Sequence, residues 1–591
     1  MRKWLIALLA VTLAVSWVPL KAAQAASIIK TEDGLEFKFG MVEKVQFSTL
    51  SGLDFTNNPE RNFRSLSVPD IAMGNQPFQV WNFTNLLFDL SKGPVSIHAN
   101  LEVEAAIDER IVDVNHLNLE RAALTYKTPG FGDLVIGFDV HLFDPEGGLI
   151  YQDEDPGIWL VGSQGIFSWN FGYHKRLAKD RGVQLGLFPA QVVAAPFSTA
   201  TNIGDKDADI FEARVGLNLP FPGGNVGLSP MFLYYRRHVP QSGTADGALS
   251  GNLAACPSIA GGFPFGNCNF NPSFNPSIGD GSRANIYFPG LVATGKFGPV
   301  MATVEAVGQF GEVENLGPAY SAPVTGIYGT SSVDISTFAI FGELAFDLSA
   351  SGIGLTPFIN VDYRKGDDDP YDDTLGGYVA ISDLTAALRK DGFKFQSISS
   401  IGPPTLGAGG EAAWGFNTGG RGIGPSIGSI IDDISLSSGV FFNNRFGKGD
   451  NPGMLKISGG LAGKVNSQWD MKAAASYLRY DTTEPIKAEA AANHISRGIL
   501  APTSSCPIAG PSALAGRALQ KCTAGTLSVS EDMGVEFNFN VGYSPVPAFR
   551  VQPFVSVFIP LGGADDINGL FLDNRDTRTA YMAGVEFRAQ F

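Results

Sequence analysis

The feature that most constrains the fold is a two-residue alternation of apolar and polar side chains in long stretches of the chain. The last eleven residues read YMAGVEFRAQF, and their apolar row is Tyr581, Ala583, Val585, Phe587, Ala589 and Phe591. Successive side chains of a strand point to opposite faces, so this stretch has one apolar face and one polar face. A barrel wall between lipid and water requires that pair of faces.

The same alternation recurs elsewhere in the chain, at 95–107, 211–219, 355–363, 469–477 and 533–543. Strands of about 9 to 13 residues are long enough to cross the hydrocarbon core at a tilt of about 40°. Strands of soluble sheets average only about 5 to 6 residues. The length of the stretches therefore favours a transmembrane barrel over a soluble sandwich.

The connections between these stretches are short and long in turn. Short turns occur at 92–94, 222–224, 297–299, 350–352, 466–467 and 545–547, and long polar segments at 49–77, 239–282, 313–331, 365–435, 481–528 and 561–577. Outer-membrane barrels place short turns in the periplasm and long loops outside, and with both ends periplasmic the strand number is even. We expect an all-β, transmembrane antiparallel up-and-down β-barrel of about 18 strands, within a range of about 16 to 20.

The N-terminus predicts export. Arg2 and Lys3 precede an apolar run at 4–20, and Ala23-Gln24-Ala25 is a small-x-small cleavage site, so we expect 1–25 to be a secretory signal peptide. A retained membrane helix is the alternative. Removal of 1–25 leaves 26–591 as a single barrel domain of the Gram-negative outer membrane, in contact with lipid and lipopolysaccharide.

The terminal strand also resembles the C-terminal signal of bacterial outer-membrane proteins, which the barrel assembly machinery recognises. Its candidate residues are Tyr581, Gly584, Phe587 and Phe591. An ordinary terminal strand of a soluble sandwich is the alternative. Together with the N-terminus, the pattern favours the outer membrane and predicts the assembly machinery as a partner.

Charge and histidine spacing exclude other classes of function. Loss of Arg2, Lys3 and Lys21 with the signal changes the formal charge from −16 to −19, and so acidic a chain is a poor nucleic-acid binder. Six histidines are scattered along the chain, with no Ser/His pair at a motif spacing. We expect no nucleic-acid partner and no enzymatic activity.

The polar rows of the strands supply the candidate pore-lining residues. They are His98, Glu102, Glu104, Glu212, Arg214, Asp362, Arg364, Lys472, Glu536 and Arg588. Charges that line a pore set its ion selectivity. Because both signs are present, the sequence predicts neither cation nor anion preference. The alternative for each residue is a solvated wall charge that no solute touches.

The four cysteines fall into two local pairs within long loops, Cys256 with Cys268 and Cys506 with Cys522. An even number of cysteines at short separation in an oxidising compartment predicts disulfides. Metal binding is the alternative, but neither loop has a CxxC spacing. The chain also has no CxxCH, so we expect no haem on it.

One acidic loop is a candidate Ca²⁺ site, because clustered carboxylates suit hard cations. Its residues are Asp367, Asp368, Asp369, Asp372 and Asp373. The loop lacks the spacing and the glycine of an EF-hand, so a solvated outer loop is the alternative. We expect no other cofactor.

The stretch 382–392 is the strongest helix candidate after the signal, with Ser382 as its N-cap and Gly392 at its end. It begins a Gly-rich segment that runs to Gly428. The segment 382–428 either folds into the lumen as a constriction or gate, or lies over the outer mouth. The sequence leaves both open.

Residues 117–157 resemble a hairpin of alginate-export-type porins. A strand LNLERAALTY (117–126) with an internal arginine precedes LVIGFDVHLFDPEGGLIYQDEDPG (134–157), a strand followed by an acidic Gly-rich loop. The resemblance covers about a tenth of the chain. It implies an 18-stranded monomeric barrel, passive passage of solute or polysaccharide, and a lumen role for Arg121. Export members line the pore with basic residues, whereas this chain has both signs.

The sequence thus predicts a passive, water-filled channel for small hydrophilic solutes. One alternative is an exporter of polysaccharide, as in alginate export. A second is a barrel sheathing a periplasmic multihaem cytochrome, which would then be its partner. A third is a surface-binding or structural barrel whose loops matter more than its lumen.

Overall fold

A computed structural model describes residues 27–51, 63–64, 72–73, 75–108, 112–153, 155–176, 208–238, 283–315, 330–352, 354–378, 380–381, 452–496, 516–572 and 579–591. The predicted signal peptide at 1–25, the proposed gate at 382–428 and Cys256, Cys268 and Cys506 lie outside them.

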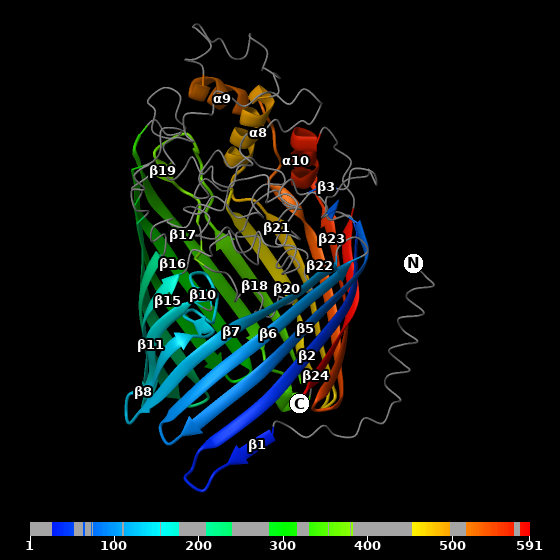
Figure 1. Cartoon of the computed structure of the whole chain (residues 1–591). Helices are drawn as coiled ribbons and strands as arrows, with labels where there is room; N and C mark the ends of the chain where they lie inside the picture. Colours follow the sequence, from blue (N-terminus) through cyan, green and yellow to red (C-terminus); the bar gives the residue numbers. More distant parts are fainter. Residues whose placement is uncertain are drawn as a thin grey trace.

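Eighteen long antiparallel strands form one closed wall (Figure 1). They are β2 (Glu36–Ser51), β5 (Asn75–Lys92), β6 (Val95–Asp108), β7 (Val112–Thr128), β8 (Gly132–Phe138), β11 (Pro156–Gln164), β12 (Phe167–Arg176), β13 (Ala208–Phe221), β14 (Gly224–His238), β15 (Arg283–Phe297), β16 (Val300–Glu314), β17 (Ser332–Phe346), β18 (Leu355–Arg364), β20 (Met454–Lys464), β21 (Trp469–Arg479), β22 (Asp532–Val546), β23 (Phe549–Pro560) and β24 (Ala580–Gln590). Each pairs with the next along the chain.

The wall closes where β2 pairs with β24, from Val42 opposite Gln590 to Ser51 opposite Tyr581. Closure leaves no unpaired strand edge in hydrocarbon, where an unsatisfied backbone group costs several kcal/mol. Two short strands extend the same sheet: β1 (Ser27–Lys30) beside β2, and β19 (Thr374–Leu375) parallel to β17. The predicted all-β barrel of 18 strands is confirmed.

The connections divide the barrel into two ends. All six predicted short turns join neighbouring strands at one end, and glycine supplies the positive φ that tight turns need, as at Gly223 (φ 89°) and Gly298 (φ 59°). The C-terminus and β1 lie at this end (Figure 1). The other end carries the helices α8 (Glu484–Ser496), α9 (Gly516–Ala524) and α10 (Gly562–Leu572).

The remaining elements are small. They are β3 (Phe63–Arg64) with β4 (Ala72–Met73), β9 (His141–Leu142) with β10 (Gln152–Asp153), and the 3₁₀ turn η5 (Ser349–Ser351). None of the helices among the described residues has the length and hydropathy to span a membrane.

The predicted alternation of faces is visible in β22. Phe537 and Phe539 are exposed on the outside (47% and 43%), whereas Glu536 and Asn538 between them are buried on the inside. Paired residues of antiparallel strands share a face, so the register carries this assignment around the barrel. Large apolar side chains such as Phe232, Leu291 and Ile359 are likewise exposed outward. The outer surface is therefore suited to lipid.

One part of the inner face differs from the expected polar lining. The inward rows of β14 to β17 carry buried apolar side chains, namely Met231, Leu233, Tyr235, Ile286, Phe288, Val292, Val307, Ile335 and Phe341. They pack in one cluster with Phe143, Leu149, Ile150 and Tyr151, and with Leu375, Tyr378, Ala380 and Ile381. The row is apolar because two chain segments, and not water, cover it.

Candidate functional site

The first of these segments connects β8 to β11 and folds inward. We call residues 139–153 the inner loop. Its two ends pair as β9 and β10, with His141 opposite Asp153 and Leu142 opposite Gln152. Between them the chain reads Asp144-Pro145-Glu146-Gly147-Gly148 before the buried residues 149–151. In Figure 1, β10 lies at mid-height of the barrel, far below the helices at the rim.

Two buried carboxylates hold the backbone of the inner loop. Asp144 accepts hydrogen bonds from the amides of Ile150 (2.6 Å) and Tyr151 (3.0 Å). Glu305, on the inward face of β16, accepts from the amides of Gly147 (2.8 Å) and Leu149 (3.4 Å). Buried backbone N–H groups need acceptors. Glu305 of the wall and Asp144 of the loop thus accept the hydrogen bonds of these buried loop amides. The loop can therefore pack against the wall without water molecules to satisfy its amides.

Glycine is required where the inner loop meets Glu305 of the wall. A Cβ on Gly147 would lie 2.7 Å from Oε2 of Glu305, closer than real side chains approach. The Gly-rich acidic sequence at 144–148 therefore fits docking inside the barrel as well as it fits an outer loop.

The side chains of Asp144 and Glu305 lie close together and share a hydrogen bond. Burial raises the pKa of Asp144 to about 7, and it outweighs the amides of Ile150 and Tyr151 and the charge of Arg214, which lower it. A proton held between Asp144 and Glu305 lets two acidic groups share one buried site.

Arg214 of β13 fastens the loop from the wall. Its Nη1 donates to the Phe143 carbonyl (2.9 Å), and its Nη2 donates to Oε1 of Glu146 (2.6 Å). Sequence reasoning placed Arg214 in the lumen as a pore-lining charge. Arg214 lies on the inward face, and its partners show that it positions the loop; its pore-lining role stays a prediction.

The second inward segment comprises the described residues 365–378 and 380–381. It leaves the end of β18 and covers the first segment. The Tyr378 hydroxyl donates to the Leu149 carbonyl (2.6 Å), and the Ile381 amide donates to the Ile150 carbonyl (2.9 Å). These residues are the start of the predicted 365–435 excursion.

Other predicted pore-lining residues lie on β6 and β7. His98 and Glu102 are half-buried on the inward row of β6, and His98 Nδ1 lies 2.6 Å from Asp89 of β5. The register places Glu104 on the same row, opposite Phe83; its side chain lies outside the described part. Arg121 of β7, opposite Asn100, has its Nε 3.9 Å from Asp139 at the start of the inner loop.

The remaining predicted residues lie on the opposite wall. Asp362 and Arg364 are buried neighbours on β18, with Nε and Oδ1 3.3 Å apart. Glu536 of β22 is buried and accepts from Ser556 (2.8 Å). The structure thus brings Asp362 and Arg364 together, whereas the predicted residues do not form one continuous site.

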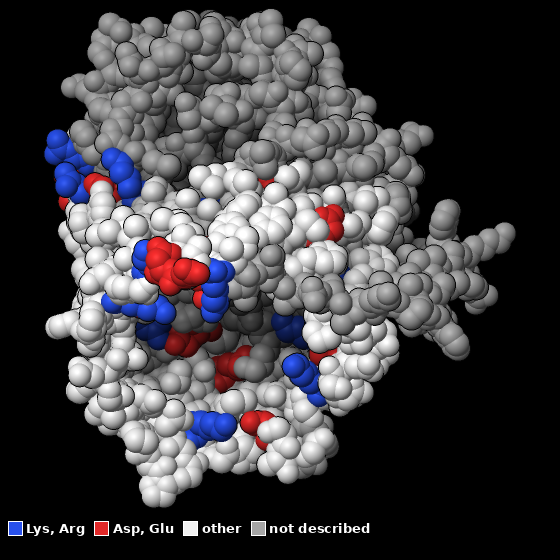
Figure 2. Space-filling view, turned by 60° about the horizontal axis from the view of Figure 1, so that its bottom comes forward, with Lys and Arg blue, Asp and Glu red and all other residues white. Residues whose placement is uncertain are grey.

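The last two predicted charges lie on β21 and β24. Lys472 is half-buried opposite Asn540, and Arg588 is exposed opposite Lys44 and Arg550. Sequence reasoning missed Arg550, which donates two hydrogen bonds to Asp470 (2.6 and 2.7 Å). Seen from the short-turn end, the molecule is hollowed, with basic and acidic side chains on the wall of the hollow (Figure 2).

The acidic loop proposed for Ca²⁺ uses its carboxylates locally. Oxygens of Asp367, Asp369 and Asp372 accept from backbone amides two residues further on. Lysine pairs with the loop as well, since Lys521 lies 2.6 Å from Asp369 and Lys365 lies 3.4 Å from Asp368. Asp373 contributes its carbonyl to Asp334 of β17. The Ca²⁺ site stays a prediction.

Of the cysteines, Cys522 lies within the described residues. It is in α9 and is disulfide-bonded. The predicted partner Cys506 and the pair Cys256 and Cys268 lie outside the described residues, so both pairings stay predictions.

The C-terminal residues join the barrel seam. The Phe591 amide donates to the Met41 carbonyl (2.8 Å), and the Met41 amide donates back (3.1 Å). Phe587 packs edge-on against Phe47 across the seam, with ring centroids 6.0 Å apart. Gly584 lies where a Cβ would meet the Phe47 carbonyl. Tyr581 pairs with Ser51 at the far end of β24. Their recognition by the assembly machinery stays a prediction.

The closed wall, its apolar outside and its polar and charged inside define the class of protein. The chain is a multi-pass β-barrel of the Gram-negative outer membrane.

Comparisons with solved structures find several bacterial chains to which this one is similar. It is similar to OccK11 (OpdR) of Pseudomonas aeruginosa, with 7% identity over 97% of this chain and 99% of that one and a TM-score of 0.38. OccD3 (OpdP) of the same organism is 8% identical over 98% of this chain and 97% of that one, with a TM-score of 0.39. OprB of Pseudomonas putida is 10% identical over 94% of this chain and 94% of that one, with a TM-score of 0.36. Identities and TM-scores of this size leave the functional conclusion to the geometry of the chain itself.

No protein-family model and no curated protein matches the chain. The resemblance of 117–157 to alginate-export-type porins therefore gains no support from the comparisons. In the structure, the acidic Gly-rich part of that stretch is the inner loop, which folds into the barrel.

Proposed function

We propose that the chain is a passive outer-membrane channel for small hydrophilic solutes, narrowed from one side by the inner loop. The observation that carries the proposal is the docking of residues 144–151 against the inner wall through Asp144 and Glu305. A segment held inside a barrel reduces the cross-section through which solute diffuses. The proposal also includes the pore-lining roles of the inward charges.

The opposite wall supplies the polar side of this channel. The inward rows of β18 to β24 carry polar side chains, among them Asn360, Lys456, Ser458, Ser476, Asn538, Asn540 and Ser556. Hydroxyl, amide and charged groups replace part of a solute's hydration shell during passage. This polar wall and the apolar cluster under the inner loop give the lumen two unlike sides.

The charges favour small solutes over an acidic polysaccharide. Inward charges of the two signs are neighbours, as in Asp362 with Arg364 and Asp470 with Arg550. A polyanion would be favoured by a continuous row of basic residues. A sheath around a periplasmic cytochrome would need a wide lumen, and the inner loop occupies part of that space.

Liposome swelling tests the proposal. Proteoliposomes that contain the folded barrel, checked by its heat-modifiable electrophoretic mobility, are exposed to uncharged sugars of increasing size. We expect uptake of monosaccharides and a steep fall with size, because the narrowed lumen sieves them. Absence of uptake with a folded barrel would contradict the channel. Equal uptake of small sugars and long oligosaccharides would favour the exporter or the sheath.

A further inference from the structure

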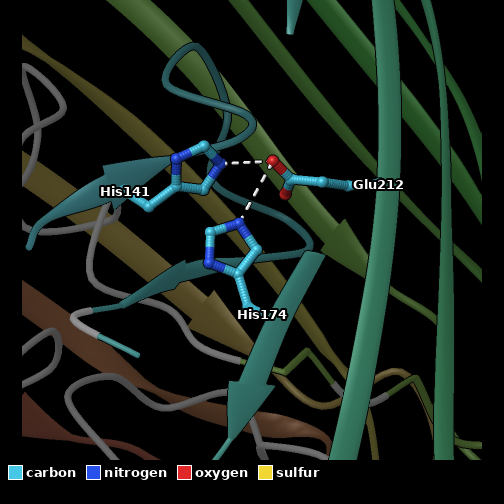
Figure 3. Close-up of side chains that lie close together, drawn as sticks. All are labelled: His141, His174 and Glu212. Carbon is cyan, nitrogen blue, oxygen red and sulfur yellow. Dashed lines mark ion pairs between the residues drawn. The ribbon is translucent and has the colours of Figure 1, made fainter. Parts of the chain in front are cut away.

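Three side chains that sequence reasoning did not connect converge at the base of the inner loop. His141 comes from β9 of the loop, His174 from β12 and Glu212 from β13. Figure 3 shows both imidazole rings turned toward the carboxylate of Glu212. Glu212 was predicted as a pore-lining residue, and it lies on the inward face as expected, but it faces these two rings.

The geometry brings three potential ligand atoms together. Nε2 of His141 lies 2.5 Å from Oε1 of Glu212, and Nε2 of His174 lies 3.4 Å from the same oxygen. Ligand atoms of the three residues all lie within 4.8 Å of one another. In a tetrahedral zinc site, metal–ligand bonds of about 2.0 to 2.1 Å place the ligand atoms about 3.4 Å apart. His174 and Glu212 already have this spacing, and His141 would move by about 1 Å.

The three residues are buried, and two of them, His174 and Glu212, lack hydrogen bonds. His174 is fully buried, and neither its Nδ1 nor its Nε2 makes a hydrogen bond. Neither carboxylate oxygen of Glu212 makes a hydrogen bond either. The contacts of this carboxylate are the ion pairs with His141 and His174. Buried polar groups in this state destabilise the folded protein. A bound cation would satisfy these groups at the point where they converge.

The neighbouring strands leave room for the cluster. A Cβ on Gly157 of β11 would lie 2.6 Å from Nδ1 of His174. A Cβ on Gly172 of β12 would lie 2.5 Å from Oε1 of Glu212 and 2.8 Å from Nε2 of His174. Two inward glycines are thus needed for these side chains to meet.

We propose that this cluster binds one divalent transition-metal ion of the zinc type. The ligands are Nε2 of His141, Nε2 of His174 and Oε1 of Glu212. Imidazole and carboxylate together suit Zn²⁺ and its neighbours in the first transition row, whereas Ca²⁺ and Mg²⁺ prefer oxygen ligands alone. Water or Oδ1 of Asn170 would occupy the fourth coordination position. The Oδ1 atom is buried without a hydrogen bond, and Nδ2 of the same side chain lies 3.5 Å from His141 Nε2.

The metal would join two parts of the barrel. His141 belongs to the inner loop, whereas His174 and Glu212 belong to the wall, so the ion cross-links the base of the loop to β12 and β13. Aromatic rings enclose the site, with Trp159 centred 5.1 Å from His141 and Tyr151 centred 5.5 Å from His174. These rings keep bulk water away from the site and strengthen the attraction between ion and carboxylate. An effect on solute passage rests on the proposed function; binding of the ion does not.

The test uses the folded, full barrel in detergent, without a histidine tag, so that it does not depend on conduction. After chelator treatment the protein is titrated with Co²⁺. We expect one ion per chain, visible absorption bands of the intensity typical of four-coordinate cobalt, and loss of these bands when Zn²⁺ is added. Zinc should also raise the unfolding temperature of the chelator-treated protein, because it binds the folded state alone.

Two variants and one control locate the site. Glu212→Gln keeps the shape of the side chain and removes its charge, and His174→Ala removes a ring; each should weaken metal binding by more than about 10-fold. His98→Ala is the control, since it removes an inward imidazole that lies beside Asp89 on another wall, and it should bind metal as the parent does. Heat-modifiable mobility identifies folded variants, and Glu212→Gln together with the parent titration suffices if His174→Ala does not fold.

Three outcomes would overturn the proposal. One is a parent protein that binds no saturable Co²⁺ or Zn²⁺, which would leave a buried ion pair between Glu212 and a protonated histidine. Another is Glu212→Gln with the affinity of the parent. The third is loss of binding in His98→Ala. Each outcome leaves the swelling assay unaffected, so failure of the metal site and failure of the channel are separable.

Discussion

Replacement of Glu305 by alanine should release the inner loop. Glu305 is fully buried and is the wall's acceptor for the amides of Gly147 (2.8 Å) and Leu149 (3.4 Å). Its loss leaves two buried N–H groups without that acceptor, at about 1 to 3 kcal/mol for each good hydrogen bond. Because the second bond is long, we expect a total of about 2 to 4 kcal/mol.

A change of this size is large on the scale of loop docking. Each 1.4 kcal/mol is a factor of ten, so the ratio of docked to released loop should fall by roughly 30- to 700-fold. The loop amides at 147–151 should then exchange with deuterium faster by about that factor, up to the limit set by the released state. Proteoliposomes with the variant should take up sugars larger than the parent admits.

Two matched variants separate loop release from other effects. Glu305→Gln keeps one carbonyl oxygen for the Gly147 amide and should show less than half of the effect. Glu314→Ala changes a carboxylate near the outer end of the same strand, away from the inner loop, and should behave as the parent. If Glu305→Ala leaves both the exchange at 147–151 and the size limit unchanged, the docked loop is not what narrows the lumen.

Three further predictions concern the loop and the seam. The pKa of Asp144 is raised to about 7 from about 3.9 in an unfolded chain, so docking of the inner loop is most favourable below about pH 4 and weakens as the pH rises to about 7. Amide exchange in the loop should quicken over this window. An Asp144→Asn variant with the same pH profile would show that Asp144 does not cause the dependence. Tyr378→Phe removes the hydrogen bond to the Leu149 carbonyl and should speed exchange of the Ile381 amide about 5-fold, for a loss of about 1 kcal/mol; an unchanged rate would mean that this bond does not fasten the second segment. Deletion of Phe591 removes both backbone bonds to Met41 and should lower the heat-modifiable fraction in outer membranes, whereas normal assembly would argue against a C-terminal signal.

The wall of the barrel could be predicted because its pattern is local. In β22 the period of two alone separates Phe537 from Asn538, and the glycines at 223 and 298 mark turns whatever the rest of the chain does. Face and turn depend on neighbours in sequence, and the requirement to close the sheet supplies the rest.

The inner loop could not be predicted in the same way. Its sequence, with Asp144 and two glycines, fits an exposed acidic loop equally well. What docks it is Glu305, 158 residues further along the chain from Gly147. A single carboxylate in the inward apolar row of β16 was the available signal, and it becomes informative only when the partner strand and register are known.

The cluster of His141, His174 and Glu212 was missed for a related reason. No spacing along the chain marks it, because His141 reaches the site only when the loop folds inward. His174 and Glu212 share a face only through the register of β12 with β13, where Glu212 is opposite Gly172. By contrast, Asp362 and Arg364 are two residues apart on one strand, and their common face followed from the sequence.

Single-channel recording tests the central claim most directly, namely that a water-filled path runs through this barrel past the docked loop. Folded protein added to a planar bilayer should give discrete, stable steps of ionic current. The same protein after heat denaturation should give none. A pure, heat-modifiable barrel that inserts into the bilayer and carries no current would contradict the account.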